Sequence, residues 1–232
     1  MDVFINQLRI PEQVHVLCVV GAGGKTSLLY QLAKEYHKRG KSVLLTTTTK
    51  MFLPQQHGVW NGSVSVIAEK LAKDGFVVAG IPVSNNKMGP LPWKQYEIAA
   101  AKADIVLLEC DGAKRLPLKM PQTGEPVFPP QYDFLITVTG LSCLDRPLKE
   151  VCHRFLLAQQ VLHCKEDHIV REFDVVQLLQ AGYGSFWEHS AGCVYLNQAD
   201  CISEHRVQHM AKLFPIPCVW GSLHAKSREE KT

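Results

Sequence analysis

A glycine-rich segment near the N-terminus carries the residues whose types and spacing best suit phosphate chemistry. Val14–Leu29 reads VHVLCVVGAGGKTSLL, which has the form of an apolar strand, a glycine-rich turn and the start of a helix. The backbone N–H groups of such a turn can bind phosphate oxygens. The ammonium group of Lys25 can reach the outer phosphates, and the hydroxyl of Thr26 can bind Mg²⁺. The segment therefore predicts a phosphate-binding loop made of Gly21, Ala22, Gly23, Gly24, Lys25, Thr26 and Ser27.

The loop departs from the full Walker A pattern at one position. That pattern has another glycine five residues before Gly24, where this chain has Val19. The loop is therefore the shortened form GAGGKT. A tight turn with an incidental lysine and threonine is the alternative, but the order of strand, loop and amphipathic helix favours phosphate binding. We expect the side chain of Lys25 to point toward the bound phosphates.

Two acidic residues follow a second apolar strand. Residues 104–112 read DIVLLECDG, so that Glu109 and Asp111 come directly after four apolar residues. This is the form of a Walker B strand, whose terminal carboxylate holds Mg²⁺ or orients the attacking water. Buried strands that end in a polar turn are common. Because a predicted phosphate loop precedes this strand in the chain, the Walker B interpretation is favoured. We predict that Glu109 and Asp111 hold the metal or, together with Lys25, take part in catalysis.

A run of threonines lies at the carboxyl end of the strand expected over residues 42–47. It reads Thr46-Thr47-Thr48-Thr49 and is followed by Lys50. Open α/β sheets bind their ligands at this end of the strands. The strand propensity of threonine accounts for Thr46 but not for a run that continues into the loop. The run thus favours a metal or phosphate role, which we assign to Thr48.

The segment after the acidic strand is predicted to be a functional loop. Residues 112–129 read GAKRLPLKMPQTGEPVFP, and the prolines exclude a regular helix. Loops of this length without secondary structure are usually functional. Lys114 and Arg115 could offset the charge of a phosphate or an anionic substrate, whereas a solvated proline-rich loop is the alternative.

A further apolar strand, Cys193–Leu196, leads into a segment that could read a nucleotide base. The order Asn197-Gln198-Ala199-Asp200 resembles the Asn-x-x-Asp segment of GTP-binding proteins, whose carboxylate accepts hydrogen bonds from guanine. Gln198 stands where lysine is usual. The alternative is a capping turn before a helix that follows Ser203. Asn197 and Asp200 are therefore candidate base-reading residues, and they favour GTP over ATP.

The rest of the chain alternates between strand and helix patterns. This order predicts one α/β domain over residues 1–232, with a mainly parallel sheet and helices on both faces. Two helices at residues 151–162 and 172–181 fall outside the alternation and predict a small helical lobe, an insertion at about 150–185. A hairpin is expected at Asn85-Asn86. Further strands are expected at 76–81, 134–139 and 217–220, and further helices at 28–36, 67–75 and 93–101.

Composition narrows the classes of function. A net charge of +3 on 232 residues, without a basic helix, argues against a nucleic-acid partner. The longest apolar run, Val14–Val20, is too short to cross a membrane, and the first residues lack the apolar core of a signal peptide. We expect a cytoplasmic protein. The eight cysteines include no CxxC pair, so most are expected to be buried free thiols.

Four blocks of the chain resemble the YqeC family, the accessory proteins of selenium-dependent molybdenum hydroxylases. The blocks are VVGAGGKTSLL, VLLTTTTKM, DIVLLECDGAKRLPLKMP and EPVFP, and DGAKRLPLK is the most specific part. The chain departs from the family pattern at Cys110, at the QTG before Glu125 and at Gln198. The resemblance implies a P-loop NTPase-like fold, a nucleotide-binding role and, as partner, a molybdenum hydroxylase or its selenium-containing cofactor.

The residue patterns predict an Mg²⁺-dependent nucleoside triphosphatase, with GTP preferred over ATP. The resemblance implies that it assists maturation of a selenium or molybdenum cofactor. Two alternatives remain. In the first, the nucleotide acts only as a switch, and Lys114, Arg115 and the threonine run contact a client protein or cofactor. In the second, GAGGKT resembles the short loop of Mur-type ligases and the protein transfers a phosphoryl group. Turnover of GTP without any partner would distinguish the hydrolase from the switch. Release of phosphate that depends on an acceptor would favour the phosphoryl-transferring enzyme.

Overall fold

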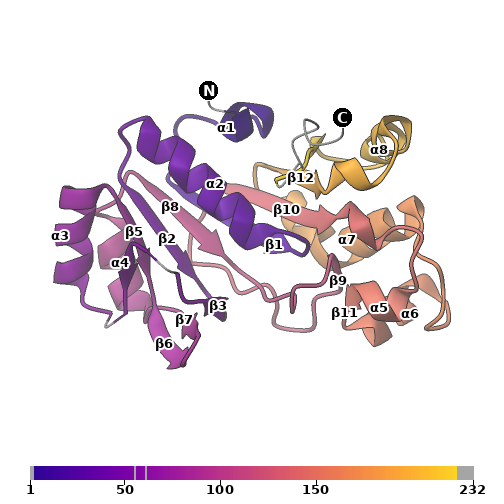
Figure 1. The fold of residues 1–232 in the computed structure, drawn as a ribbon, viewed down its shortest axis with the longest axis horizontal. Coiled ribbons are helices and arrows are strands. Elements are labelled where there is room, and N and C mark those ends of the chain that lie inside the picture. Colours follow the sequence, from indigo (N-terminus) through magenta and orange to yellow (C-terminus); the bar gives the residue numbers. More distant parts are fainter. Residues whose placement is uncertain (1–2, 55, 61, 224–232) are drawn as a thin grey trace, which may run out of the picture.

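The computed structural model describes residues 3–54, 56–60 and 62–223. Within these ranges, eight strands form the main sheet in the order β13-β12-β10-β1-β8-β2-β5-β4 (Figure 1). Every pair of neighbouring strands in it is parallel, as the alternation of strands and helices predicts. The strands are β1 Val16–Gly21, β2 Val43–Thr47, β4 Gly58–Val59, β5 Phe76–Ala79, β8 Ile105–Glu109, β10 Phe134–Gly140, β12 Gly192–Asn197 and β13 Cys218–Trp220.

Helices cover both faces of the sheet, and two apolar cores result. Leu17 and Val19 of β1 face a core shared with α1 Val3–Gln7 and α2 Lys25–Lys38. Cys18 and Val20 face the opposite core, because successive side chains of a strand point to opposite faces. The second core is shared with α3 Val64–Asp74, α4 Trp93–Ala100, α7 Glu172–Trp187 and α8 Glu204–Ala211. The predicted α/β architecture, a mainly parallel sheet with helices on both faces, is confirmed.

Smaller elements surround the carboxyl ends of the strands. The predicted hairpin forms from β6 Ile81–Ser84 and β7 Lys87–Gly89, and β3 Met51–Phe52 joins it as a third antiparallel strand. Beyond β10, the short strands β9 Leu118–Lys119 and β11 Cys152–His153 pair in parallel. The remaining elements are η1 Leu141–Cys143, α5 Leu148–Val151, α6 Phe155–Leu162 and η2 Ala199–Cys201.

Two helix predictions are wrong in their extent. The helix expected over 151–162 is interrupted by β11, whose pairing with β9 and the left-handed backbone of Arg154 (φ 64°) exclude a continuous helix there. The helix expected to end near Ala181 runs on to Trp187. Gly182 lies inside it, and a Cβ atom at that position would come within 2.6 Å of Pro121. Gly182 therefore does not end the helix; it allows the helix to pack closely against the proline-rich loop.

The cysteines are free thiols and most of them are buried, as the sequence predicts. All eight cysteines are free, and five of them, Cys18, Cys110, Cys143, Cys152 and Cys193, are buried. In the described ranges, no helix has both the length and the apolar character that crossing a membrane requires.

Candidate functional site

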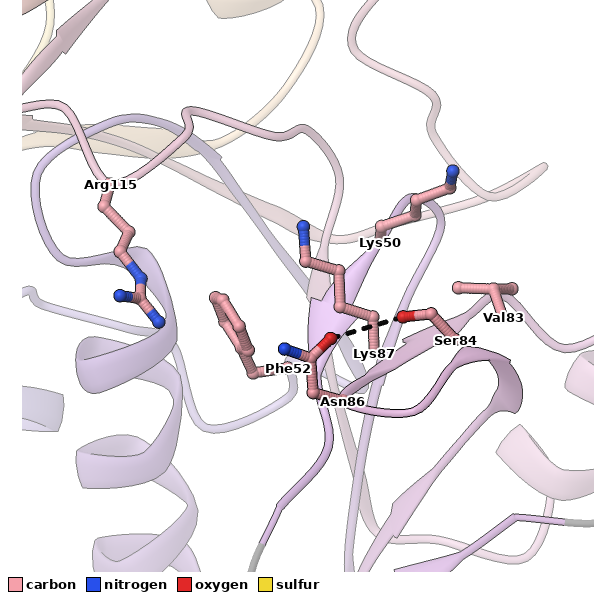
Figure 2. A pocket seen from close by; sticks show the side chains of 7 residues that line it. All are labelled: Lys50, Phe52, Val83, Ser84, Asn86, Lys87 and Arg115. Atoms are coloured by element: carbon pink, nitrogen blue, oxygen red, sulfur yellow. Dashed lines mark hydrogen bonds between the residues drawn. The ribbon is translucent and has the colours of Figure 1, made fainter.

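A cleft of about 1080 Å³ opens at the carboxyl ends of the central strands. The chain runs from β1 to β2 on one side, returns to β8, and then crosses to β10 on the other side of β1. Open α/β sheets bind ligands where the strand order reverses in this way. Lys50, Phe52, Lys87 and Arg115 line the cleft on its β2 side (Figure 2). The rest of the lining comes mainly from residues 23–27, 112–117, 197–198, 200–201 and 222–223.

The glycines of the predicted phosphate loop hold backbone conformations that other residues avoid. Gly23 and Gly24 have φ values of 74° and 127°. A Cβ atom at Gly23 would lie 2.3 Å from the backbone nitrogen of Gly140, and one at Gly24 would lie 2.3 Å from Nδ2 of Asn197. The loop is therefore packed against the ends of β10 and β12. Ala22 is buried beneath it, and its N–H donates to Val138 O at 2.8 Å.

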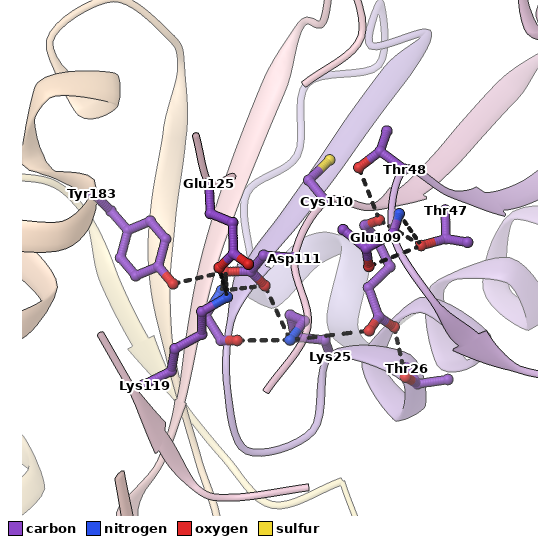
Figure 3. A network of polar contacts seen from close by, with 12 residues as sticks. Lys25, Thr26, Thr47, Thr48, Glu109, Cys110, Asp111, Lys119, Glu125 and Tyr183 are labelled. Atoms are coloured by element: carbon purple, nitrogen blue, oxygen red, sulfur yellow. Dashed lines mark hydrogen bonds and ion pairs between the residues drawn. The ribbon is translucent and has the colours of Figure 1, made fainter. Parts of the chain in front are cut away.

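Lys25 is folded back into the loop, whereas the sequence predicted a side chain that points toward a ligand. Its Nζ atom donates to Gly21 O at 2.6 Å and lies 3.1 Å from Oδ1 of Asp111 (Figure 3). Burial lowers the pKa of Lys25, but the charges of Asp111 and Glu109 outweigh burial and raise the pKa above its usual value. The ammonium group is thus charged and paired at the floor of the cleft, and it must leave Gly21 O to reach a phosphate.

Thr26 and Glu109 meet at the rim of the loop. The hydroxyl of Thr26 donates to Oε2 of Glu109 at 2.6 Å, which joins the first turn of α2 to the end of β8 (Figure 3). Burial raises the pKa of Glu109 above its usual value, although Lys25 and the bond from Thr26 act against this. A hydroxyl and a carboxylate are hard oxygen donors of the kind that Mg²⁺ prefers. The pair therefore fits one side of a magnesium site.

The rest of such a site would have to come from water and substrate. Among the residues that the structure describes, no group of three or more His, Cys, Asp or Glu side chains could hold a metal ion. Mg²⁺ sites that use one or two protein ligands are usually completed by waters and substrate phosphates. The pair of Thr26 and Glu109 beside a phosphate loop suits this type of site and not a closed cage of protein ligands.

Asp111 holds the loop from below and does not face the cleft. It is fully buried, and its carboxylate accepts hydrogen bonds from Gly21 N–H at 3.1 Å and from Tyr183 OH at 2.7 Å. Lys119 pairs with its second oxygen at 3.1 Å (Figure 3). Burial raises the pKa of Asp111, but the charges of Lys25 and Lys119 outweigh burial and keep the pKa below its usual value. Both carboxylate oxygens of Asp111 therefore have protein partners beneath the loop, whereas Glu109 lines the cleft.

The charged contacts continue from Asp111 to Arg154, the residue that precedes α6. Lys119 also pairs with Glu125 at 2.7 Å, and Glu125 receives two hydrogen bonds of 2.6 and 2.7 Å from Arg154. These hydrogen bonds from Arg154 and Lys119 outweigh burial and lower the pKa of Glu125. Burial, followed by the charges of Arg154, Lys119 and Lys114, lowers the pKa of His153 to about 4. A continuous chain of ion pairs thus connects the phosphate loop with the residues that follow β11.

The predicted base-reading residues lie at the opposite side of the cleft from Lys50. Asn197 donates through Nδ2 to Gly23 O at 2.7 Å and accepts from Leu223 N–H at 3.1 Å, so it ties the phosphate loop to the segment after β13. Asp200 is exposed at the cleft, and its Oδ1 atom accepts a hydrogen bond from the hydroxyl of Ser222. Ser203 makes no side-chain cap on α8. Asp200 thus lies at the cleft wall, within η2, the short helix that precedes α8.

Gln198, which replaces the usual lysine, is turned toward β10. Its Oε1 atom accepts a hydrogen bond of 2.7 Å from the hydroxyl of Ser142. Its backbone is left-handed, with φ 61°. Lys114 and Arg115, which also line the cleft, have φ values of 48° and 64°. Such conformations cost on the order of 1 to 3 kcal/mol each and concentrate at functional sites.

The threonine run contributes to the cleft through a different residue from the one predicted. The hydroxyl of Thr48 donates to Val127 O at 2.6 Å, and this side chain is buried outside the cleft lining. Thr49 and Lys50 line the cleft instead. Ser27 lines it as well, next to Thr26. The threonine that the strand end places at the cleft is therefore Thr49.

Comparison with known proteins gives the family. The model of the family described as YqeC protein matches residues 17–156. An uncharacterized YqeC protein of Escherichia coli is 30% identical over 198 residues, which cover 82% of this chain and 77% of that protein. The chain belongs to the YqeC family. The part that matches the YqeC model includes the phosphate loop, Glu109, Asp111, Lys119, Glu125 and Arg154, but it ends before Asn197.

Two solved structures resemble the YqeC-family chain in outline. One is the septum site-determining protein MinD from Pyrococcus horikoshii, complexed with Mg-ADP, with 14% identity and a TM-score of 0.45 over 88% of this chain and 78% of that chain. The other is a GTPase in its apo form from Pyrococcus abyssi, with 13% identity and a TM-score of 0.34 over 90% of each chain. At these identities and TM-scores, neither informs on the site.

Proposed function

We propose that this YqeC-family protein binds a nucleoside triphosphate together with Mg²⁺, and that it hydrolyses the nucleotide. The observation that carries this proposal is the 2.6 Å hydrogen bond between Thr26 and Glu109, at the rim of a glycine-rich loop that opens helix α2. It brings a hydroxyl and a carboxylate together beside backbone groups suited to phosphate. When bound, Mg²⁺ would neutralise phosphate charge and align the phosphates for attack by water.

The residues of the chain have separate roles in this proposal. Residues 23–27 of the loop, which line the cleft, bind the phosphates, and Lys25 exchanges its contact with Gly21 O for a phosphate oxygen. Glu109 holds the metal or orients the attacking water. Asp111, which is buried among Lys25, Lys119 and Tyr183, fixes the position of the loop and does not touch the substrate.

We assign the base to the β12 side of the cleft and propose that GTP is preferred over ATP. An ionised carboxylate only accepts hydrogen bonds, which suits the two donors on the Watson–Crick edge of guanine. Asp200 offers such a carboxylate at the cleft wall, and Ser222 positions one of its oxygens. Adenine presents a different pattern of donors and acceptors, so it would leave the carboxylate of Asp200 poorly matched.

The biological role proposed is assistance in the maturation of a selenium or molybdenum cofactor. It rests on the resemblance of the four sequence blocks to accessory proteins of molybdenum hydroxylases, and the partner would be such a hydroxylase or its cofactor. A test is co-purification of the protein with a selenium-dependent hydroxylase, in the presence and absence of GTP and Mg²⁺. Loss of hydroxylase activity on deletion, without loss of hydroxylase protein, would support the role; unchanged activity would contradict it.

A nucleotide-gated binding module is the second candidate, and the ion-pair chain favours it specifically. Lys25, Asp111, Lys119, Glu125 and Arg154 connect the phosphate loop to the segment before α6. Movement of Lys25 toward a phosphate would remove one partner of Asp111 and so alter this chain. Phosphate release from GTP by the protein alone separates the two candidates. Steady turnover supports the hydrolase, and tight binding without turnover supports the module.

A further inference from the structure

A second hollow adjoins the cleft on its β2 side. It has a volume of about 590 Å³ and lies between the hairpin of β6 and β7, the strand β3 and the loop after β8 (Figure 2). Three cationic side chains line it: Lys50, Lys87 and Arg115. Phe52 lies among them, and Ser84 and Asn86 complete its polar edge. These three cations and Phe52 also line the cleft, so the hollow and the cleft share these four residues.

An exposed aromatic ring is the unusual feature of this hollow. The side chain of Phe52 is 40% exposed. The guanidinium carbon of Arg115 lies 4.3 Å from the centre of the ring, and Nζ of Lys87 lies 5.3 Å from it. Figure 2 shows Arg115 reaching Phe52 from the loop after β8, whereas Lys87 comes from the hairpin. Cations near an aromatic face are stabilised, and a flat ligand could be held against the same ring.

The charge of the hollow is not balanced by the protein. Across the described ranges, Lys50, Lys87 and Arg115 form no ion pair, and none of the described residues that line the hollow is acidic. Three like charges around one hollow repel one another, and a bound anion would relieve this repulsion. A volume of several hundred cubic ångströms is typical of a small-molecule site.

We propose that the hollow binds a second small molecule, an anion with a planar unsaturated part. Its acid group lies among Lys50, Lys87 and Arg115, and its planar part lies against Phe52. The strand order places the hollow beside β2 and the predicted base-reading residues beyond β12, on opposite sides of β1. The second molecule therefore approaches the phosphate loop from the side away from the base. The statement that it lies next to a nucleotide rests on the proposed function; the anion site itself does not.

Phenyl phosphate is a suitable probe, because it joins a flat ring to a phosphate. Ligand-observed NMR titration of the full chain should show saturable binding that is at least fivefold tighter than that of phenol or inorganic phosphate. Phe52→Leu and Lys87→Gln should each weaken binding at least fivefold, whereas Lys94→Gln, on the exposed surface of α4, should change it less than twofold. Absence of binding, or equal binding by all three variants, overturns the proposal.

The phenyl phosphate titration, repeated in the presence of a non-hydrolysable GTP analogue and Mg²⁺, distinguishes binding in the hollow from binding at the phosphate loop. Retained binding of phenyl phosphate supports a second site, and complete displacement overturns it, because the ring and phosphate would then occupy the nucleotide's own place. If the analogue itself does not bind while phenyl phosphate still responds to Phe52→Leu and Lys87→Gln, the anion site stands and the proposed nucleotide function fails.

Discussion

Thr26 and Glu109 are joined by a 2.6 Å hydrogen bond, whereas Asp111, only two residues beyond Glu109, accepts its hydrogen bonds from Gly21 N–H and Tyr183 OH. Glu109 lines the cleft, and Asp111 is fully buried beneath the phosphate loop. The pKa values of the two carboxylates are also shifted in opposite directions: burial raises the pKa of Glu109, whereas Lys25 and Lys119 hold the pKa of Asp111 below its usual value despite its burial. They are therefore expected to respond differently to neutralisation.

Glu109→Gln should preserve the fold and slow the chemistry. Glutamine keeps the size of the side chain and an oxygen that can accept from Thr26, but it lacks the charge that suits Mg²⁺. We expect phosphate release from GTP to fall by at least about tenfold, equivalent to about 1.4 kcal/mol. Measurement of the release rate over a range of Mg²⁺ concentrations tests this. A variant that works at the parent rate at every concentration rules out the assignment of Glu109.

Asp111→Asn should instead destabilise the protein. It removes the buried charge that pairs with Lys25 and Lys119, and breaking a buried pair in this way typically costs about 3 to 5 kcal/mol. Urea unfolding measures the loss. The control is Asp74→Asn, whose partner Lys70 lies 3.9 Å away on the exposed surface of α3, and there the change should stay within about 1 kcal/mol. Equal losses in both variants would show that Asp111 does not hold the loop.

Asp200→Asn should change the choice of base. Asparagine presents one acceptor and one donor, which suits xanthine, whereas aspartate presents only acceptors, which suit guanine. Each mismatch should cost on the order of 1 to 3 kcal/mol, so the ratio of GTP to XTP affinity should shift by more than about tenfold. Calorimetry with both nucleotides on both proteins gives this ratio. A parent that prefers ATP, or a ratio that does not move, places base recognition elsewhere.

His153 predicts a specific dependence of stability on pH. The pKa of this side chain is lowered to about 4 in the folded protein, from a usual value of 6.5. Between these values the unfolded chain binds more protons than the folded chain, so the free energy of unfolding falls as the pH is lowered from 6.5 toward 4. His153→Gln should reduce this fall, and the exposed His205→Gln should not. Urea unfolding at pH 7.5 and pH 5 tests it, and a fall equal to that of the parent would count against the lowered pKa of His153.

Local sequence patterns predicted the elements that form the rim of the cleft. The spacing of glycines, Lys25 and Thr26 after an apolar strand predicted the turn between β1 and α2, and the positive φ values of Gly23 and Gly24 give its physical reason. The apolar run before Glu109 predicted β8. In each case the signal lies within a few neighbouring residues, where strand period and glycine freedom act directly.

The buried ion-pair chain could not be predicted in the same way. Tyr183 lies 72 positions after Asp111, and Arg154 lies 29 positions after Glu125, so their contacts depend on the packing of α7 and β11 and on no local spacing. The interruption of the expected helix at Cys152–His153 has the same origin, because it depends on pairing with β9. The choice between Thr48 and Thr49 depended on how the chain turns after β2, which a run of identical residues does not encode.

Calorimetric titration of GTP into the parent protein and into Thr26→Ala, with and without Mg²⁺, tests the central claim most directly. The parent should bind GTP at least about tenfold more tightly with Mg²⁺, and Thr26→Ala should lose this dependence, because the hydroxyl beside Glu109 is removed. Thr48→Ala is the matched control: its hydroxyl donates to Val127 O outside the cleft, so the Mg²⁺ dependence should persist. A parent that binds neither GTP nor ATP, or a Thr26→Ala variant with unchanged Mg²⁺ dependence, would contradict the proposed nucleotide site.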